Sequence, residues 1–298
     1  MKILITGATG LIGRELTADL TRQGHEIFRL TRGQPKEAND ITWNPTAGSI
    51  PKARLEGLDA VIHLAGENIA GARWNDAVKE RLRISRVQAT KLLCDTLCQL
   101  QNPPKTLICA SAIGYYGNRG SETLTESSPA GTGFLADLCR DWEAAADSAR
   151  QKGMRVVHVR IGVVLTPKGG ALAQMLTPFK LGVGGVIGSG KQYWSWVAVD
   201  DVLGAIQHCL NHTEISGPVN AVAPNAATNH DFTKTLGSVL HRPTIFPMPA
   251  FAARLALGEM ADELLLSSTR VIPQRLQETG YQFHCPTLES ALKHVLKT

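Results

Sequence analysis

The sequence lacks the patterns that mark membrane-spanning, metal-binding and nucleic-acid-binding proteins. No window approaches the roughly 20 apolar residues of a membrane-spanning helix. The net charge is +5, but the lysines and arginines are scattered rather than gathered into a basic run. The six cysteines include no Cys-x-x-Cys pair and have no zinc-site spacing with histidine. We therefore expect no membrane span, no metal and no nucleic-acid partner.

The beginning of the chain also lacks a secretory signal. Met1 to Thr6 is a short apolar stretch that runs directly into glycines, whereas a signal peptide needs a basic start, a longer apolar segment and a small-residue cleavage site. Cysteines without a spacing pattern are typical of reduced, buried thiols. The sequence therefore predicts a cytoplasmic protein that begins with a buried strand.

What is present is an alternation of short apolar segments and amphipathic ones. The expected strands are residues 2–6, 25–31, 59–65, 106–112 and 155–165, and the expected helices are residues 11–23, 75–100 and 133–151. Strands this apolar, separated by helices, predict a parallel sheet covered on both faces. The expected fold class is α/β, a Rossmann-type doubly wound parallel sheet.

The alternation ends after Leu165, where a glycine-rich stretch begins. The expected domains are a nucleotide-binding domain of residues 1–165, to which 197–224 return, and a smaller, mostly helical substrate domain of residues 166–196 and 225–298. In the smaller domain, Pro249 predicts the first turn of a helix and Gly258 predicts its end.

A glycine motif lies between the first expected strand and the first expected helix. It reads Thr6-Gly7-Ala8-Thr9-Gly10-Leu11-Ile12-Gly13. Glycines permit a sharp turn and let backbone N–H groups approach a diphosphate, at which the positive end of the helix points. This context favours a dinucleotide site over a glycine-rich turn without a ligand. The cofactor-binding residues predicted here are Gly7, Thr9, Gly10, Leu11, Ile12 and Gly13.

The end of the second expected strand indicates which dinucleotide binds. An NAD enzyme places an acidic residue there for the ribose 2′-hydroxyl, whereas this chain has Thr31 and Arg32. A carboxylate would repel a 2′-phosphate, and an arginine can hold it through a charge-assisted pair. Thr31 and Arg32 therefore predict NADP(H) as the cofactor. The alternative is that Arg32 is an exposed loop charge.

Several stretches together carry a resemblance to a known family. The spacing of the glycine motif resembles that of extended short-chain dehydrogenases/reductases, as does His63-Leu64-Ala65-Gly66 after the third expected strand. The segments 64–86, 111–117, 178–196, 217–232 and 270–292 resemble the YfcH-like epimerase family, including its C-terminal segment. This resemblance covers essentially the whole chain. It implies that Leu64, Ala65 and Gly66 contact the cofactor, while His63 is interpreted as a packed strand-end residue.

The catalytic pair of that superfamily is missing. Catalysis there uses a Tyr, a Lys four residues later and a Ser, so that the phenol can exchange a proton during hydride transfer. The residues four positions after Tyr115, Tyr116, Tyr193 and Tyr281 are Arg119, Gly120, Val197 and Cys285. On the expected helix, Phe134 or Leu135 stands in the place of Tyr, and Leu138 or Cys139 in the place of Lys. The standard catalytic residues therefore cannot be transferred to this chain.

Two other residues remain as catalytic candidates. Ser111 ends the fourth expected strand, where the sites of parallel sheets open, and Tyr116 follows in the loop. Their alternative roles are capping and lining a cleft. Trp194 and Trp196 flank the glycine-rich loop and either wall the nicotinamide or a planar substrate, or pack in the core.

Two arginines stand out because of their position. Arg160 interrupts an apolar strand, where an unpaired cation would be costly, so it should find a carboxylate or a bound phosphate. Arg86 lies on the long expected helix. The family resemblance favours cofactor contact for Arg86 and Arg160, and structural salt bridges are the alternative.

Three interpretations of the function remain open. The leading hypothesis is an NADP(H)-dependent oxidoreductase or epimerase that acts on an unknown small molecule. The alternative is a non-catalytic NADP(H) sensor or regulatory protein, which the missing Tyr/Lys pair supports. A third interpretation, nucleotide-sugar epimerisation, rests on the family resemblance and normally needs NAD and the Tyr base. A homodimer is compatible with the sequence.

Overall fold

The computed structural model describes residues 1–297 and divides into two compact units. Unit 1 comprises Met1–Ser111, Leu138–Val159 and Ile206–Pro218; unit 2 comprises Ala112–Asp137, Arg160–Ala205 and the chain from Val219 onward. The domain boundaries expected from the sequence differ from these and stay a prediction.

The main sheet confirms the predicted Rossmann-type α/β fold. Its seven strands have the order β11-β7-β5-β4-β1-β2-β3. They are β1 (Lys2–Thr6), β2 (Glu26–Thr31), β3 (Asp40–Thr42), β4 (Ala60–His63), β5 (Thr106–Ala112), β7 (Arg155–Ile161) and β11 (Gly217–Ala221). The pairs from β3 to β5 are all parallel, and β1 and β4 are almost completely buried because they are covered on both faces. The sequence pattern does not indicate β3, a three-residue edge strand.

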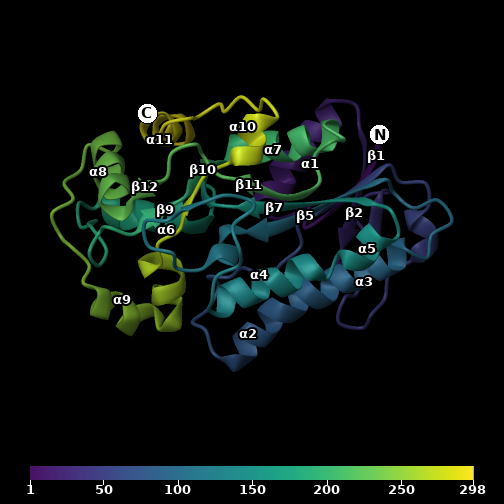
Figure 1. Cartoon of the computed structure of the whole chain (residues 1–298), viewed down its shortest axis with the longest axis horizontal. Helices are drawn as coiled ribbons and strands as arrows, with labels where there is room; N and C mark the ends of the chain where they lie inside the picture. Colours follow the sequence, from purple (N-terminus) through teal and green to yellow (C-terminus); the bar gives the residue numbers. More distant parts are fainter. Residues whose placement is uncertain (298) are drawn as a thin grey trace. The chain divides into compact units, whose positions relative to one another are not determined.

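Helices cover both faces of this sheet. They are α1 (Leu11–Arg22), α2 (Asp76–Arg83), α3 (Ala89–Leu97), α4 (Phe134–Ala144), α5 (Asp147–Gln151) and α7 (Val199–Asn211). In unit 1, α1 lies on one side of the strands and α3 and α5 on the other (Figure 1). Leu93 and Leu97 of α3 pack on Leu4, Val61 and other buried strand residues, which fixes the helix on the sheet.

The long helix expected over residues 75–100 is present, but it is not regular. A π-helical turn, η2 (Ile84–Gln88), lies between α2 and α3, and the three together form one continuous helical segment (Figure 1). Such turns insert an extra residue into a helix and are frequent at functional sites. Arg86 lies inside this turn.

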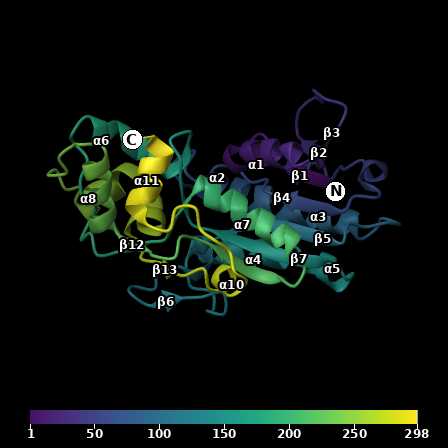
Figure 2. The ribbon, with the colours of Figure 1, turned by 90° about the horizontal axis from the view of Figure 1, so that it is seen from above.

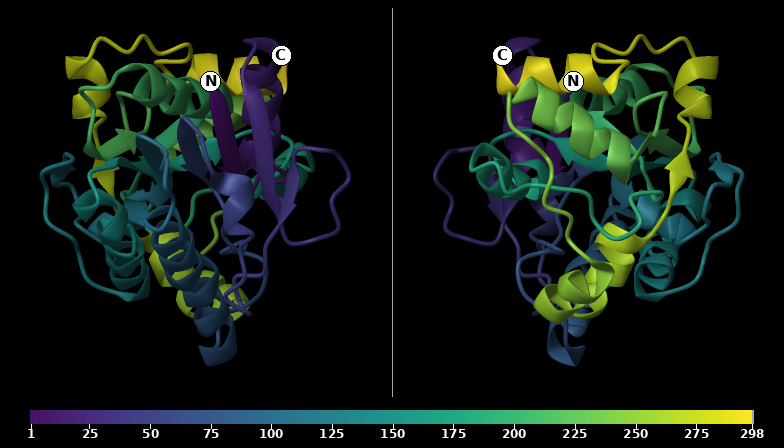
Figure 3. Two further views of the ribbon diagram at one scale, coloured as in Figure 1. Left: turned by 90° about the vertical axis from the view of Figure 1, so that its right-hand side faces the viewer. Right: turned by 90° about the vertical axis from the view of Figure 1, so that its left-hand side faces the viewer.

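Unit 2 contains short strand pairs and most of the later helices. Its remaining elements are β6 (Thr123–Leu124), β8 (Val163–Leu165), β9 (Tyr193–Trp194), β10 (Trp196–Ala198), β12 (Ala227–Thr228), β13 (Arg270–Val271), α6 (Gly170–Lys180), α8 (Asn229–Val239), α9 (Ala250–Leu257), α10 (Gln274–Glu278) and α11 (Leu288–Leu296). The views agree that α8 and α11 lie side by side, and they share one apolar core (Figures 2 and 3). As predicted, α9 begins after Pro249 and ends at Gly258. Within residues 1–297, no helix is long and apolar enough to cross a membrane.

Candidate functional site

The turn between β1 and α1 is packed so closely that only glycine fits at two positions. Gly7 has a φ of +68°, and a Cβ on it would lie 2.7 Å from the carbonyl oxygen of Leu64. A Cβ on Gly13 would overlap the carbonyl oxygen of Gly7. The Gly10 N–H donates to that same oxygen over 2.9 Å, which closes the turn. The glycine motif therefore builds a tight strand–turn–helix connection, as its spacing predicts.

The first turn of α1 offers N–H groups that no side chain caps. Gly10 is the N-cap and makes no side-chain hydrogen bond, and the first turn contains no acidic residue. Thr9 and Gly10 are exposed, while Leu11 and Ile12 are half-buried. Because the N-terminus of a helix carries a partial positive charge, these N–H groups suit a bound anion.

A chain of buried hydrogen bonds ties this turn to the end of β4. The hydroxyl oxygen of Thr6 accepts the N–H groups of Leu64 and Ala65, each over 3.1 Å. Its own proton then goes to Nδ1 of His63, 2.7 Å away. Nε2 of His63 donates to the hydroxyl of Thr90 on α3 over 2.9 Å. The segment after β4 is thereby held against the glycine turn.

His63 is neutral in this chain of hydrogen bonds. Its side chain is completely buried, and burial lowers the pKa of the imidazole to about 4. The nearest partners are the hydroxyls of Thr6 and Thr90. These contacts agree with the interpretation of His63 as a packed strand-end residue.

The π-helical turn η2 binds the backbone of Glu67, which follows Gly66. The hydroxyl of Ser85 accepts the N–H of Glu67 over 3.1 Å, and the guanidinium of Arg86 donates to the carbonyl oxygen of Glu67 over 2.9 Å. The carboxylate of Glu67 pairs instead with Arg81 over 3.1 Å. Two consecutive residues of η2 therefore fix both ends of one residue that follows β4.

Arg86 is a partly buried cation whose hydrogen bonds all go to neutral oxygens. Besides Glu67, it donates over longer distances to the carbonyl of Leu82 and the hydroxyl of Ser85. Its Cζ lies 5.2 Å from the ring centre of Trp142, and a Cβ on Gly66 would come within 3.4 Å of it. Burial lowers the pKa of the guanidinium. An arginine placed beside Gly66 with only neutral partners can still pair with an anion.

Arg32, unlike the partly buried Arg86, lies on the surface. It is exposed at the end of β2, and the hydroxyl of the neighbouring Thr31 donates to the carbonyl of Gly33 over 3.2 Å. No ion pair involves Arg32 within the described part of the chain. Its guanidinium can therefore reach a phosphate without giving up a protein partner.

Ser111 has a carboxylate partner that the sequence pattern did not indicate. The Ser111 hydroxyl, on a residue only 3% exposed, donates to Oε1 of Glu143 over 2.7 Å. Glu143 lies on α4, one turn after Cys139, at i+4. A hydroxyl–carboxylate pair thus lies between the end of β5 and α4 in unit 1. Whether Ser111 acts in catalysis stays a prediction.

Arg160 and Tyr116, which the sequence suggested separately, are in contact with each other in unit 2. The Arg160 guanidinium donates to the Tyr116 hydroxyl over 3.0 Å and lies 3.5 Å from the centre of the Tyr115 ring. The Tyr116 hydroxyl donates in turn to Oδ1 of Asn220 over 2.7 Å. Burial raises the pKa of Tyr116 to about 12. The predicted cofactor contact of Arg160 and the predicted catalysis by Tyr116 remain untested, but both side chains have protein partners here.

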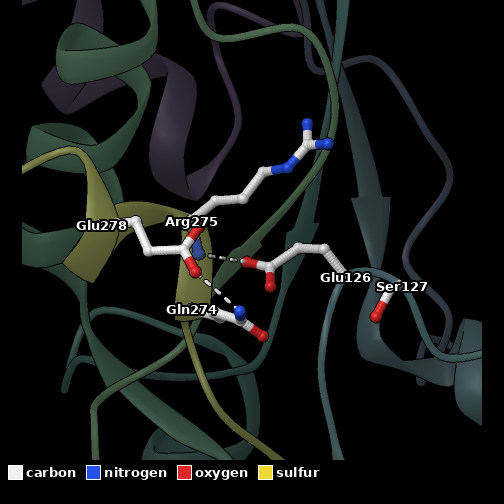
Figure 4. A pocket seen from close by; sticks show the side chains of 5 residues that line it. All are labelled: Glu126, Ser127, Gln274, Arg275 and Glu278. Atoms are coloured by element: carbon white, nitrogen blue, oxygen red, sulfur yellow. Dashed lines mark hydrogen bonds between the residues drawn. The ribbon is translucent and has the colours of Figure 1, made fainter.

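Next to this pair lies a small polar cavity of about 130 Å³ (Figure 4). It is lined by Glu126, Ser127, Gln274, Arg275 and Glu278. Oε1 of Glu126 accepts the N–H groups of Asn220 and Arg275, while its Oε2 has no hydrogen-bond partner among the described residues. Burial raises the pKa of this carboxyl. The cavity is too small for a dinucleotide, and Glu126 serves to join β11 to α10.

The two tryptophans proposed to wall a ligand belong to the apolar core of unit 2. Trp194 is 5% exposed and packs on Phe232 with ring centres 5.4 Å apart, and Trp196 is 1% exposed. The alternative role in core packing therefore describes both. Sequence reasoning also missed Thr6, Ser85 and Glu143, because a single Thr, Ser or Glu has no signal until the fold brings its partner near.

The family is shown by the chain's similarity to known proteins. Residues 3–221 match the NAD dependent epimerase/dehydratase family, and residues 248–295 match a domain of unknown function, DUF1731. The chain belongs to the NAD-dependent epimerase/dehydratase family, as its motifs suggested.

Its relatives are similar over nearly their whole length. The chain is 44% identical over 290 residues to Epimerase family protein Mb2239 of Mycobacterium bovis, covering 97% of this chain and 96% of that protein. It is 39% identical over 303 residues to human Epimerase family protein SDR39U1, covering 99% and 100%.

Two solved structures with similar sequences have the same fold. A crystal structure of human SDR39U1 with NADPH superimposes with a TM-score of 0.90 at 37% identity and covers all of both chains. A structure described as the nucleoside-diphosphate sugar epimerase from Corynebacterium glutamicum has a TM-score of 0.84 at 37% identity, covering 99% of this chain and 58% of that one.

Proposed function

We propose that this chain binds NADP(H) and catalyses hydride transfer to or from a carbon of a small carbonyl or alcohol compound. The observation that carries the proposal is the glycine turn, in which Gly7 and Gly13 admit no side chain and the first turn of α1 is uncapped. The human relative of known structure holds NADPH at 37% identity, which supports the same cofactor here.

The chemical groups that unit 1 presents around the glycine turn are suited to the parts of an NADP(H) molecule. The N–H groups of residues 9–13 suit the diphosphate, and Gly66 leaves room beside Arg86 for a second anionic contact. Arg32, exposed after β2, suits the 2′-phosphate. Leu64 and Ala65 are fixed next to the turn by Thr6, so their backbone forms the adjoining edge.

When bound, the cofactor would supply the hydride, and the protein would have to position it and handle one proton. The family's Tyr and Lys are replaced by apolar or thiol side chains, of which Leu135 is 6% and Cys139 4% exposed. The Ser111–Glu143 pair is the hydroxyl–carboxylate contact that unit 1 offers for holding a proton at the end of β5.

The cofactor proposal is tested by titrating the protein with NADPH and NADH. We expect Arg32→Ala to weaken NADPH binding by about 10-fold or more and to leave NADH binding nearly unchanged, because a charge-assisted phosphate contact is worth about 1.5–3 kcal/mol. Arg22→Ala, which removes an exposed arginine at the far end of α1, is the matched control and should change neither affinity. Equal losses for both nucleotides in Arg32→Ala would refute the proposed selectivity.

The catalytic proposal is tested by following NADPH consumption with a panel of aldehydes and ketones. We expect turnover with at least one carbonyl class, and a large loss of kcat in Ser111→Ala with little change in NADPH affinity. If the protein binds NADPH tightly and turns over nothing across the panel, the hydride-transfer proposal fails while the binding proposal stands.

A second function, an NADP(H) sensor, is favoured by one observation. The hydroxyl of Tyr116 is enclosed between Arg160 and Asn220 with a raised pKa, so this tyrosine is poorly suited to proton exchange at neutral pH. In a pull-down with this chain as bait, a sensor should retain a partner protein in amounts that depend on added NADP. Equal recovery with and without the nucleotide would rule against it.

A further inference from the structure

The loop that carries Arg32 connects β2 directly to β3 at the edge of the main sheet. It comprises residues 32–39, which we call the β2–β3 loop, and it contains no helix or strand. Residues 32–38 are all exposed. Because an exposed loop of this kind makes few contacts of its own, its conformation depends on the side chains that reach it from the neighbouring strands.

Side chains on one face of the β2–β3 pair bind the start of this loop. Arg29 of β2 lies opposite Asp40 of β3 in the parallel register. Thr31 and Thr42 form the pair two residues further on, so their side chains point to the same side of the strands. Both threonine hydroxyls donate to the carbonyl oxygen of Gly33, over 3.2 and 3.3 Å. The loop is therefore fixed at its first turn.

Asp40 binds the second half of the loop through one buried carboxylate. Its Oδ2 accepts the backbone N–H groups of Lys36 and Glu37 over 2.8 and 3.1 Å. Its Oδ1 accepts Nε of Arg29 over 2.7 Å, and the residue is only 5% exposed. Burial disfavours the carboxylate, but these hydrogen bonds outweigh burial and lower the pKa of Asp40. Asp40 therefore holds the loop in its ionised form.

Arg29 binds a second carboxylate that belongs to the same loop. Its Nη2 lies 2.9 Å from Oε1 of Glu37, whose side chain is 68% exposed. An ion pair this exposed adds little to stability, but it determines where the carboxylate lies. Without the pair, the Glu37 carboxylate would be free to approach Arg32 and to repel a phosphate bound there.

We propose that Asp40 and Arg29 are positioning residues for NADP(H) selectivity, because they hold the β2–β3 loop in the conformation in which Arg32 meets the 2′-phosphate. This rests on the proposed function, in which Arg32 binds that phosphate. Asp40 and Arg29 act through Arg32 and need not touch the nucleotide. NADH lacks the 2′-phosphate, so its affinity should not depend on the loop.

Two substitutions with opposite effects on charge separate positioning from simple electrostatics. Asp40→Asn removes a negative charge, and Arg29→Met removes a positive one. The 2′-phosphate carries about −1.5 to −2 charges at neutral pH, so charge alone would make the first variant bind NADPH more tightly and the second less tightly. If the pair positions the loop, both variants bind NADPH less tightly.

The dissociation constants for NADPH and NADH are measured by isothermal titration calorimetry at one salt concentration. We expect the preference for NADPH over NADH to fall about 5- to 10-fold in both variants, which is part of the loss expected for Arg32→Ala, with NADH affinity changed by less than about 2-fold. The double variant should lose no more than the larger single loss, because both residues act through one contact. The matched control is Arg22→Met, which breaks an exposed ion pair with Asp19 and should keep the wild-type preference.

A third variant changes no charge and serves if Asp40→Asn does not fold. Thr42→Val removes one of the two hydroxyls that bind the Gly33 carbonyl, on an exposed residue of β3. The preference for NADPH should fall about 2- to 3-fold, since one neutral hydrogen bond is lost, whereas electrostatics alone predicts no change.

Limited proteolysis with trypsin reports on the loop without any nucleotide. Trypsin cleaves after Arg32 and Lys36, and mass spectrometry identifies the two cleavages. Both should be faster in Asp40→Asn and Arg29→Met than in the wild type and in Arg22→Met, because a loop released from its contacts is cut more readily. Unchanged cleavage rates would show that the pair does not hold the loop, and would overturn the proposal.

The binding data contain further results that would overturn it. Tighter NADPH binding by Asp40→Asn, or an unchanged preference in Asp40→Asn and Arg29→Met, would do so and leave NADP(H) as the proposed cofactor. An equal loss of affinity for both nucleotides would do so too, because it would assign the pair a role only in the fold. A wild-type protein that binds NADPH and NADH equally well would refute this inference together with the selectivity on which it rests.

Discussion

Arg86 and Arg160 both place a guanidinium group partly or fully out of solvent, but their neighbours differ. Arg160, 3% exposed in unit 2, is held by the Tyr116 hydroxyl and the Tyr115 ring. Arg86, in unit 1, has carbonyl and hydroxyl partners and lies beside Gly66. A buried arginine can thus complete a cluster of protein groups, whereas a partly buried arginine with neutral partners can still bind an anion.

Substitutions of glycine near α1 test whether the nucleotide binds in unit 1, close to Arg86. Gly13→Ala places a Cβ against the carbonyl of Gly7 and should lower NADPH affinity at least about 100-fold, with about 1–3 kcal/mol lost from the free energy of unfolding. Gly24→Ala, at a φ of +82° in the loop after α1, should lose about 1 kcal/mol of stability but retain NADPH binding. If both variants bound NADPH equally well, the turn would not be the site.

The next prediction concerns the cluster around Arg160. Arg160→Met removes the cation from between Tyr115 and Tyr116 and should lower the free energy of unfolding by about 3 kcal/mol, measured by urea denaturation. The folded variant should bind NADPH with unchanged affinity. Arg160→Lys keeps the charge and should lose less stability. A stable Arg160→Met protein with lost NADPH affinity would instead make Arg160 a cofactor ligand.

Acid should destabilise unit 1 through the buried His63. Because burial lowers the pKa of His63 from 6.5 to about 4, its neutral form stabilises the fold fully above pH 6.5, and this stability is lost as the pH falls from 6.5 toward 4. The loss amounts to about 3 kcal/mol at most. Urea denaturation at pH 7.5 and pH 4.5 should show a smaller difference in His63→Gln than in the wild type.

The control for this titration is His241→Gln, which changes an exposed histidine. It should retain the wild-type difference between the two pH values. Should His63→Gln keep the full difference, the acid sensitivity would come from other groups.

The smallest effect in this series is expected for Arg86→Met. NADPH affinity should fall by about 10-fold, while the free energy of unfolding should stay within about 1 kcal/mol or rise, because burial disfavours this cation. Arg160→Met is expected to show the opposite result, a loss of stability with unchanged NADPH affinity. Loss of stability without loss of affinity would make Arg86 a structural residue.

Much of the fold could be predicted from local patterns. The parallel sheet and its helices follow from apolar periodicity, and the glycine spacing located the turn before α1. The π-turn at Ile84–Gln88 and the edge strand β3 could not be predicted, because neither has a periodicity of its own. For the candidate site, the family resemblance pointed to Arg86, but the sequence did not indicate that its hydrogen-bond partners are neutral.

The sequence by itself determined the class of fold, the glycine turn before α1 and the absence of a Tyr-x-x-x-Lys pair, because each depends on residues that are near one another in the chain. Only the tertiary structure decided which arginine is enclosed by tyrosines, which carboxylate meets Ser111, and where apolar side chains remain in solvent. These outcomes depend on contacts between residues far apart in the chain, 44 positions for Arg160 and Tyr116 and 32 for Ser111 and Glu143, and such contacts leave no pattern in a local stretch of sequence.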